Sequence, residues 1–258
     1  MLRVVFFDAA GTLFHTREPA GLSYAKIARR FGVEASERLV GDSFRRSFGA
    51  APGLAFGPGH EAAKLRRLER EWWGQLVRAT FAGIGHFADF DAYFDTLFAF
   101  FADPANWTCD RDAPALLAAL SEHGIALGVI SNFDHRIYRI LEALGLRRYF
   151  DSITISSEAG YAKPAPEIFR VALQRHSLPA ADAVHVGDSE PLDVGGARAA
   201  GLGAVLVDPQ NADLAEGPAP APSGELSGRR EPPGPENRYL RVRALGEVAA
   251  ALGRRGFP

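Results

Sequence analysis

The chain of 258 residues has almost no cysteine, since Cys109 is the single one. No disulfide can form within the chain, which fits a reducing compartment such as the cytoplasm. Cys109 stands in no recognisable motif, so we expect a small buried hydrophobic residue rather than a reactive thiol. The overall composition, 47% hydrophobic and 23% charged, is that of an ordinary globular protein.

The sequence also lacks an excess of charge of either sign and lacks long apolar runs. A net charge of -2 gives no electrostatic basis for binding nucleic acid. No apolar run is long enough to span a membrane, and the first one is cut short by Asp8, which argues against a signal peptide. We therefore expect a cytoplasmic protein that binds neither nucleic acid nor membranes. Its oligomeric state, monomer or homodimer, stays open.

What the sequence does contain is an alternation of short apolar runs and helical patterns. Residues 4–7, 126–130 and 183–186 have the character of buried parallel strands, and residues 153–155 and 204–207 are weaker strand candidates. Helical apolar spacing separates these runs. The alternation predicts a doubly wound α/β fold with a parallel sheet covered by helices on both faces.

A long segment after the first strand has a different character. Residues 16–105 contain four stretches of helical spacing and no convincing strand, which predicts a helical insertion into the sheet domain. Trp72 and Trp73 are expected to belong to the core of this insertion, although they could instead line a ligand pocket.

The remaining segments complete the predicted organisation. Residues 1–15 and 106–208 would form the sheet core. Residues 209–237 are rich in proline and glycine and poor in large apolar residues, so a mobile surface loop is expected there. Residues 238–258 would add a final strand and helix to the core.

Polar side chains follow the predicted core strands at the points where those strands end. Asp8 follows the first strand, Ser131 and Asn132 follow the second, and Asp188 follows the third. In an open parallel sheet these positions meet at one edge. Two neighbouring carboxylates repel each other unless a cation lies between them, and Mg²⁺ suits such an oxygen site. Lys163 and the Ser131 hydroxyl would then meet phosphate oxygens, and Asp8 could attack phosphorus.

Each of these residues also has a purely structural interpretation. Asp8 and Asp188 could be turn or cap residues, Ser131 and Asn132 could begin the next helix, and Lys163 could be a solvated loop charge. A helix start at Ser131 would itself offer backbone amides to an anion. The occurrence of all of them in this order favours a functional site over coincidence.

The motifs resemble those of the haloacid dehalogenase superfamily. The matching stretches are Phe7-Asp8-Ala9-Ala10-Gly11-Thr12-Leu13, Ile130-Ser131-Asn132, Lys163-Pro164, Gly187-Asp188-Ser189 with Asp193, and Gly195-Gly196-Ala197. The helical insertion resembles the C1-type cap of this superfamily. Trp72-Trp73, Ser131-Asn132-Phe133-Asp134 and His185-Val186-Gly187-Asp188 resemble the subfamily of haloacid dehalogenase-like hydrolase domain-containing proteins close to the rhythmically expressed gene 2 product.

The resemblance implies Mg²⁺-dependent hydrolysis of a small phosphorylated metabolite through an aspartyl-phosphate. Asp8 would be the nucleophile and a metal ligand. The backbone carbonyl of Ala10 and the carboxylate of Asp188 would be further Mg²⁺ ligands. Asp193 would support the metal site, through water or from outside the coordination shell.

The same resemblance implies the phosphate-binding residues. Ser131, Asn132 and Lys163 would hold the transferring phosphoryl group, and Thr12 would brace the loop after Asp8. Substrate choice would depend on cap side chains that face the site, which helical periodicity does not identify.

Ala10 departs from the superfamily pattern. Phosphatases of this superfamily usually carry an aspartate there as the general acid and base, and loss of such a group typically costs about 10²–10⁴-fold in rate. One interpretation is a weak or specialised phosphatase, with water or a cap residue as the proton donor. Asp134 or His15 could replace the acid by proximity, although both are more readily explained as structural or solvated.

Two other interpretations of Ala10 stay open. The chain could bind a phosphorylated ligand without turnover, or it could cleave a carbon–halogen or phosphonate bond. Dehalogenases of the superfamily tend to lack the acid that Asp188 provides, which argues against the first of these bond types. A phosphonate hydrolase would need a Schiff-base lysine in the cap, where Lys26 and Lys64 stand in no recognisable motif.

Overall fold

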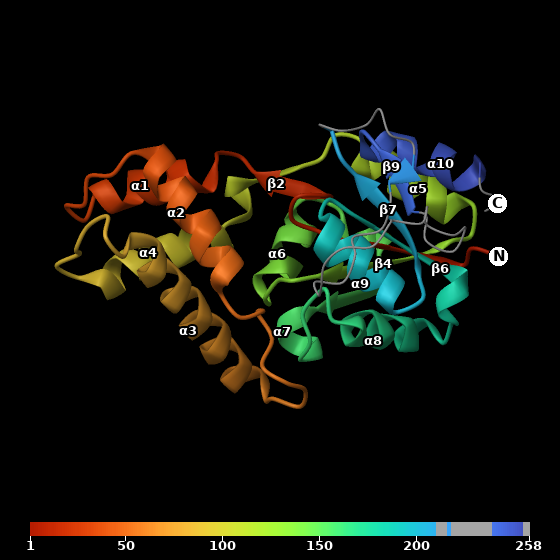
Figure 1. Ribbon diagram of the computed structural model, residues 1–258, viewed down its shortest axis with the longest axis horizontal. Helices are drawn as coiled ribbons and strands as arrows, with labels where there is room; N and C mark the ends of the chain where they lie inside the picture. The colour runs from red at the N-terminus through yellow and green to blue at the C-terminus, as the bar shows by residue number, and fades with distance from the viewer. Residues whose placement is uncertain (210–215, 218–238, 255–258) are drawn as a thin grey trace, which may run out of the picture.

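The computed structural model of the chain describes residues 1–209, 216–217 and 239–254. A sheet with helices on both faces lies beside a unit of four helices, and a short two-stranded ribbon joins the two parts (Figure 1). Among the described helices, none has the length and apolar character needed to cross a membrane.

The main sheet has the strand order β5-β4-β1-β6-β7-β9-β8. Its strands are β1 (Val4–Phe7), β4 (Ala126–Ser131), β5 (Ser152–Ile155), β6 (Ala183–Gly187), β7 (Gly203–Val207), β8 (Glu216–Gly217) and β9 (Tyr239–Val242). All neighbours pair in parallel except β8, which is antiparallel to β9. The first strand is central, since Phe7 pairs with Val129 of β4 on one side and with Val186 of β6 on the other.

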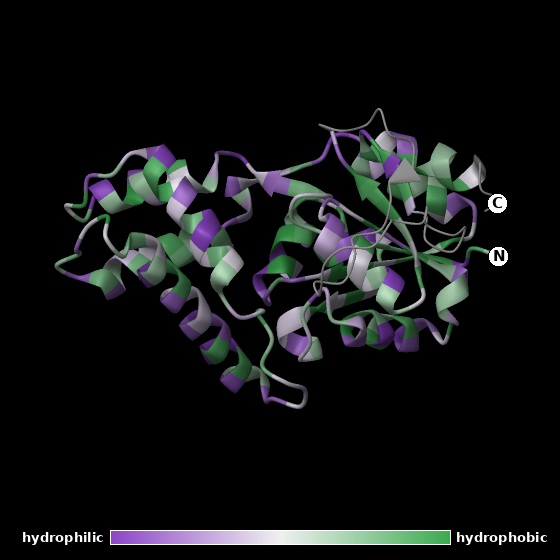
Figure 2. Cartoon of the chain, in the orientation of Figure 1, coloured by the Kyte–Doolittle hydropathy of each residue, from purple (hydrophilic) through white to green (hydrophobic). Residues whose placement is uncertain are grey.

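Helices cover both faces of this sheet. They are α5 (Ala113–Glu122), α6 (Arg136–Ala143), α7 (Ser156–Ala159), α8 (Pro166–His176), α9 (Gly195–Ala199) and α10 (Val248–Arg254), with short 3₁₀ turns at Pro104–Asn106, Arg147–Tyr149, Ala180–Asp182 and Leu245–Glu247 and a π-helical turn at Glu190–Val194. Alternate residues of β1 enter two cores: Val5 and Phe7 pack with α5, α6 and α10, and Val4 and Phe6 pack with α8 and α9. The strands are accordingly hydrophobic, whereas the helices carry mixed residues (Figure 2).

The predicted doubly wound α/β fold is confirmed. The weaker strand candidates at 153–155 and 204–207 are β5 and β7. A helix start at Ser131 and Asn132 is wrong, because Ser131 is the last residue of β4 and α6 begins only at Arg136. Apart from Pro209 and β8, the segment 209–237 lies outside the described residues.

The helical unit is built from α1 (Ala20–Arg29), α2 (Glu37–Ala50), α3 (Ala62–Phe81) and α4 (Phe90–Ala102). Its core is rich in aromatic rings, among them Phe87 and Tyr93, which stack with centroids 4.1 Å apart. This aromatic core is separate from the two cores of the sheet, so the unit has its own source of hydrophobic stability.

The connecting ribbon was not predicted. In it β2 (Phe14–Thr16) pairs antiparallel with β3 (Trp107–Cys109), so the chain leaves and re-enters the core at one place. Cys109 is half-buried in β3 rather than fully buried, and burial raises the pKa of its thiol. Strands of three residues give too little alternation to be recognised from sequence.

One close contact fixes how α1 and α2 cross. A Cβ built on Gly21 would lie 2.7 Å from the Cα of Gly41 and 2.8 Å from the carbonyl oxygen of Glu37. Both are backbone atoms, so the clash could be relieved only by moving a helix.

Gly21→Ala should therefore lower the free energy of unfolding by about 1–3 kcal/mol, the usual cost of overpacking. The measurement is the urea midpoint at an unchanged m-value. Gly49→Ala is the matched control, because a Cβ on Gly49 of α2 meets nothing within 4 Å. It should be neutral or stabilise by up to about 1 kcal/mol. Equal effects of the two substitutions would contradict the close crossing.

Candidate active site

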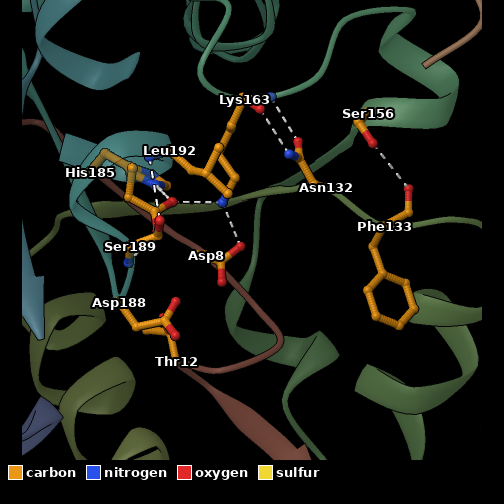
Figure 3. A network of polar contacts seen from close by, with 11 residues as sticks. Asp8, Thr12, Asn132, Phe133, Ser156, Lys163, His185, Asp188, Ser189 and Leu192 are labelled. Atoms are coloured by element: carbon orange, nitrogen blue, oxygen red, sulfur yellow. Dashed lines mark hydrogen bonds and ion pairs between the residues drawn. The ribbon is translucent and has the colours of Figure 1, made fainter. Parts of the chain in front are cut away.

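Asp8 lies at the carboxyl end of β1, in the middle of the sheet. Its side chain is buried, with 6% of the residue exposed, and its backbone N–H donates to the carbonyl of Val186 at 2.8 Å. The parallel neighbours β4 and β6 end at the same edge, and they bring Ser131 and Asp188 there. The strand ends thus gather the predicted residues, and Figure 3 shows Asp8 and Asp188 at this edge.

Lys163 lies between two buried carboxylates. Its Nζ donates to Asp8 Oδ1 and to Asp193 Oδ1, both at 2.6 Å (Figure 3). Burial alone would lower the pKa of Lys163, but the charges of Asp193 and Asp8 outweigh it and raise that pKa. Lys163 is therefore a permanent cation beside the candidate nucleophile.

Asn132 positions this lysine. Its Nδ2 donates to the carbonyl of Lys163 at 2.9 Å, and the backbone N–H of Lys163 donates to its Oδ1 at 2.7 Å. The side-chain amide of Asn132 is thus bonded to the Lys163 backbone. This bonding gives Asn132 a positioning role, and phosphate binding by Asn132 stays a prediction.

Asp193 comes from the π-helical turn after β6 and is almost fully buried. Its Oδ1 lies 2.8 Å from His185 Nε2, and its Oδ2 accepts from the backbone N–H of Ser189 at 2.9 Å. Burial would raise the pKa of Asp193, but Lys163 and His185 together lower it, so Asp193 is ionised.

This ionised carboxylate determines the tautomer of His185. A carboxylate can only accept, so His185 Nε2 carries the proton and donates to Asp193. Burial lowers the pKa of His185, which keeps the ring neutral. Its Nδ1 is buried without a hydrogen-bond partner among the described residues. His185 therefore supports Asp193 from inside the core.

Asp188 faces Asp8 across the loop after β1. Although the residue borders the open cavity, partial burial and the charges of Asp8 and Asp193 raise the pKa of Asp188 to about 6. Thr12 Oγ1 donates to Asp188 Oδ1 at a long 3.5 Å. Gly11 makes this approach possible, because its φ is 103° and a Cβ there would lie 2.5 Å from Asp188 Oδ2.

The donor set fits a divalent cation. Asp8, Asp188 and Asp193 each offer a carboxylate oxygen, and these oxygens lie within 4.8 Å of one another. Burial, and to a smaller extent the charge of Asp193, raises the pKa of Asp8 although Lys163 opposes them, so a further cation would favour its ionised form. Oxygen ligands of this kind suit Mg²⁺.

A cavity of about 480 Å³ opens above these carboxylates. Asp8, Ala10, Ser131 and Lys163 line its charged end. Side chains of the helical unit line another part of its wall, so the cavity lies between that unit and the sheet edge. The volume is typical of small-molecule sites.

Comparison with known proteins agrees with this geometry. Residues 2–201 match the profile of haloacid dehalogenase-like hydrolases. The chain belongs to this family. Haloacid dehalogenase-like hydrolase domain-containing protein 3 of Bos taurus is 35% identical over 210 residues, which cover 80% of this chain and 82% of that protein.

Two further relatives have informative names. The rhythmically expressed gene 2 protein of Drosophila melanogaster is 25% identical, with 80% of this chain and 82% of that protein covered. The phosphoserine phosphatase of Thermus thermophilus is 38% identical over 111 residues, which cover 43% of this chain and 45% of that enzyme.

Solved structures confirm the family fold. A phosphatase of the family from Thermococcus onnurineus matches with a TM-score of 0.63 at 22% identity, covering 98% of both chains. A putative hydrolase of the family from Bacillus subtilis, solved with bound magnesium, matches with a TM-score of 0.67 at 19% identity, covering 98% of this chain and 99% of that one.

A buried ion pair at the far end of the cavity was not predicted. Asp134 Oδ1 accepts from Arg136 Nε at 2.8 Å, and its Oδ2 accepts from Arg136 Nη2 at 2.5 Å and from Trp73 Nε1 at 2.6 Å. Burial would raise the pKa of Asp134, but Arg136 outweighs it and the net shift is downward. Asp134 is therefore ionised and is not the replacement acid.

The two neighbouring tryptophans have different surroundings. Trp72 is buried in the helical unit, as expected, and its Nε1 donates to the carbonyl of Pro52 at 2.9 Å. Trp73 packs against the core of the helical unit, as expected, and it also lines the cavity and reaches Asp134 of the sheet domain. The charge of Asp134 could have indicated that it needs a hydrogen-bond donor. The sequence does not show which segment supplies this donor.

A second contact links α3 to the same loop. Glu69 is fully buried, and its carboxylate accepts from the backbone N–H of His135 at 3.3 Å and also contacts the His135 ring. Together with the bond from Trp73 to Asp134, this contact holds the helical unit against the sheet domain. His15 also lines the cavity, from β2, with 44% of its side chain exposed.

Asp134→Asn should lower the free energy of unfolding by about 3–5 kcal/mol, because it leaves Arg136 buried without a counter-charge. Asp42→Asn, which removes a surface pair with Arg45, should cost less than about 1 kcal/mol. Urea unfolding at pH 7 measures both, and similar losses in the two variants would contradict a buried pair.

The same pair predicts a pH dependence. Because the folded pKa of Asp134 lies below its unfolded value, its contribution is complete above that unfolded value of about 4. The contribution is lost as the pH falls through the lower, folded pKa. The stability difference between wild type and Asp134→Asn should therefore be constant from pH 7 to 5 and shrink below pH 4.

Proposed function

We propose that this chain is a Mg²⁺-dependent phosphatase that hydrolyses a small phosphorylated metabolite through an aspartyl-phosphate on Asp8. The observation that carries the proposal is the position of Asp8. It lies at the floor of the cavity, bonded to Lys163, with Asp188 and Asp193 oxygens within 4.8 Å. The phosphatases among its relatives support the choice of a phosphate ester.

In the proposed first step an Asp8 carboxylate oxygen attacks phosphorus. A bond forms between that oxygen and phosphorus, and the bond from phosphorus to the leaving-group oxygen breaks. Lys163 and the Ser131 hydroxyl hold the equatorial phosphoryl oxygens, where charge must be balanced in the transition state. Water then attacks the same phosphorus, releases phosphate and restores the Asp8 carboxylate.

Asp8, Asp188 and the backbone carbonyl of Ala10 would hold Mg²⁺, and Asp193 would support the site. When bound, Mg²⁺ neutralises these carboxylates and withdraws charge from the phosphoryl oxygens. Asp193 also keeps Lys163 in place through its 2.6 Å contact.

The helical unit would act as a cap over the bound phosphoryl group. Its contacts through Trp73 and Glu69 hold it against the loop at 134–135, beside the cavity. A closed site excludes water and strengthens the charge interactions inside. The single Cys109 supports the cytoplasm as the compartment in which the enzyme acts.

Ala10 favours one alternative from another class, a protein that binds a phosphorylated ligand without turnover. In this alternative the cation and phosphate site is the same, but the chain has no acid beside Asp8. Such a protein would be stabilised by ligand and would release no phosphate.

Asp8→Asn should abolish phosphate release from a panel of phosphate esters, since the amide cannot form the intermediate. Asp91→Asn is the control, because the Asp91 side chain is 83% exposed on the helical unit. It should keep wild-type activity. Turnover that survives Asp8→Asn would contradict the mechanism, and binding without turnover in wild type would favour the alternative.

Mg²⁺ should raise the melting temperature of the wild-type protein. At 100 times its dissociation constant, a cation that binds only the folded state adds about 2.7 kcal/mol to the free energy of unfolding. Asp188→Asn should abolish most of this shift, whereas Asp91→Asn should retain it. Thermal unfolding with Mg²⁺ and then with excess EDTA measures the effect without depending on turnover. An equal shift in Asp188→Asn would contradict the predicted ligand set.

A further inference from the structure

The cavity has two chemically different ends. Around Asp8 its wall is charged, as described above. The side chains that α1 to α4 contribute to its wall are all apolar or aromatic, and they include Tyr24, Phe44, Phe48, Trp73, Phe98 and Phe101. A leaving group that extends from the phosphoryl site toward the helical unit therefore meets rings rather than hydrogen-bonding groups.

Arg136 is a charged side chain at this end of the cavity, but it leaves the wall without a net charge. Arg136 is paired with Asp134 through two hydrogen bonds. Its guanidinium carbon lies 4.0 Å from the centre of the Phe98 ring and 5.0 Å from that of Trp73. The pair carries no net charge, so this end offers no excess charge to a second phosphate or to an amine.

Phe48 indicates that the aromatic wall serves a ligand. It lines the cavity with 43% of its surface exposed, in contact with the rings of Phe44 and Trp73. An exposed phenylalanine gains little from folding, because only burial removes apolar area from water. A flat apolar ligand would cover it.

Among the described acidic side chains of the charged end, none is free to protonate the leaving group, because Asp8 would be the nucleophile, Asp188 would hold Mg²⁺ and Asp193 is paired with Lys163. Ala10 lines the cavity near Asp8 with a methyl group. Burial raises the pKa of Tyr24 far above neutrality, and the ring of His15 is 44% exposed with Nε2 3.8 Å from Asp110. A general acid acts best when it is positioned and its pKa is near the working pH. A leaving group that departs as a stable anion needs no such acid.

We propose that the substrate is an aryl phosphate, in which an aromatic ring carries the phosphate on an acidic, phenol-type oxygen. The inference rests on the proposed phosphatase function and deepens it. The ring would occupy the aromatic end of the cavity. The phenolate, whose conjugate acid has a pKa of about 10 or lower, would leave without protonation.

Four esters separate the two parts of this proposal. They are 4-nitrophenyl phosphate (ring, acidic oxygen), benzyl phosphate (ring, alkanol oxygen), acetyl phosphate (no ring, acidic oxygen) and glycerol phosphate (neither). Steady-state kcat and KM with Mg²⁺ are measured for wild type and Asp8→Asn.

We expect 4-nitrophenyl phosphate to have the highest kcat/KM. Benzyl phosphate should bind with a similar KM but turn over at least about 100-fold more slowly, the scale of a missing acid. Acetyl phosphate should turn over fast with a KM at least about 3-fold higher. Turnover of all four esters within about 3-fold, or a preference for glycerol phosphate, would overturn the aryl assignment while leaving the phosphatase function intact. Absence of Asp8-dependent turnover with every ester would overturn both.

Phe48→Ala tests the ring site separately. It should raise the KM for 4-nitrophenyl phosphate about 3–10-fold, which corresponds to the binding free energy of one aromatic contact. It should leave the KM for acetyl phosphate unchanged. Leu39→Ala is the matched control, since Leu39 is 47% exposed on the same helix α2 and lies outside the cavity wall. The ring site would be overturned if Phe48→Ala changed the KM for both esters equally. It would also be overturned if Leu39→Ala changed the KM for 4-nitrophenyl phosphate as much as Phe48→Ala does.

Ala10→Asp tests the leaving group. A carboxylic acid at this position should raise the ratio of kcat for benzyl phosphate to kcat for 4-nitrophenyl phosphate at least about 10-fold. An equal rise for both esters, or no rise for benzyl phosphate, would contradict the view that the missing acid selects the leaving group.

Discussion

The contact on which the site depends is the one between Lys163 and two buried carboxylates. A lone buried carboxylate is expensive, and here three acidic side chains meet at one edge of the sheet. The Nζ of Lys163 offsets part of their charge, at 2.6 Å from both Asp8 and Asp193. Much of the local structure maintains this contact: Asn132 holds the Lys163 backbone, and His185 donates to Asp193.

The sequence was informative about the fold and this edge because both follow from local patterns. Short apolar runs mark the strands, and in a parallel sheet the residue after each strand must lie at the same edge. Asp8, Ser131 and Asp188 could therefore be grouped before any coordinates were known. Lys163 lies in a loop, so it was grouped with them by its charge and its place along the chain rather than by a strand end.

The features that escaped sequence reasoning are contacts between distant segments. Trp73 and Asp134 are separated by 61 residues, and nothing in the sequence around either residue shows that they meet. Asn132 has the polarity of a phosphate-binding residue, and only its bonds to the Lys163 backbone show its positioning role. The β2–β3 ribbon is too short to produce a recognisable alternation.

The cavity contains both the predicted residues at the sheet edge and the unpredicted contacts of the helical unit. Its charged end can hold a phosphoryl group and a cation, and its aromatic end can hold a ring. In the proposed mechanism Ala10 contributes no acid, so the leaving group must depart as a stable anion. A chain with a polar cap wall or with an acid at position 10 would suit a different ester.

Chemical trapping of Asp8 tests the central claim most directly. The protein is mixed with 4-nitrophenyl phosphate and Mg²⁺, quenched in acid within one turnover and reduced with borohydride, which reacts with an acyl phosphate and spares a free carboxylate. Peptide mass spectrometry should then find the reduced side chain at Asp8, in the peptide between Arg3 and Arg17. Phosphate release during the same turnover, with Asp8 unmodified, would contradict an aspartyl-phosphate on this residue.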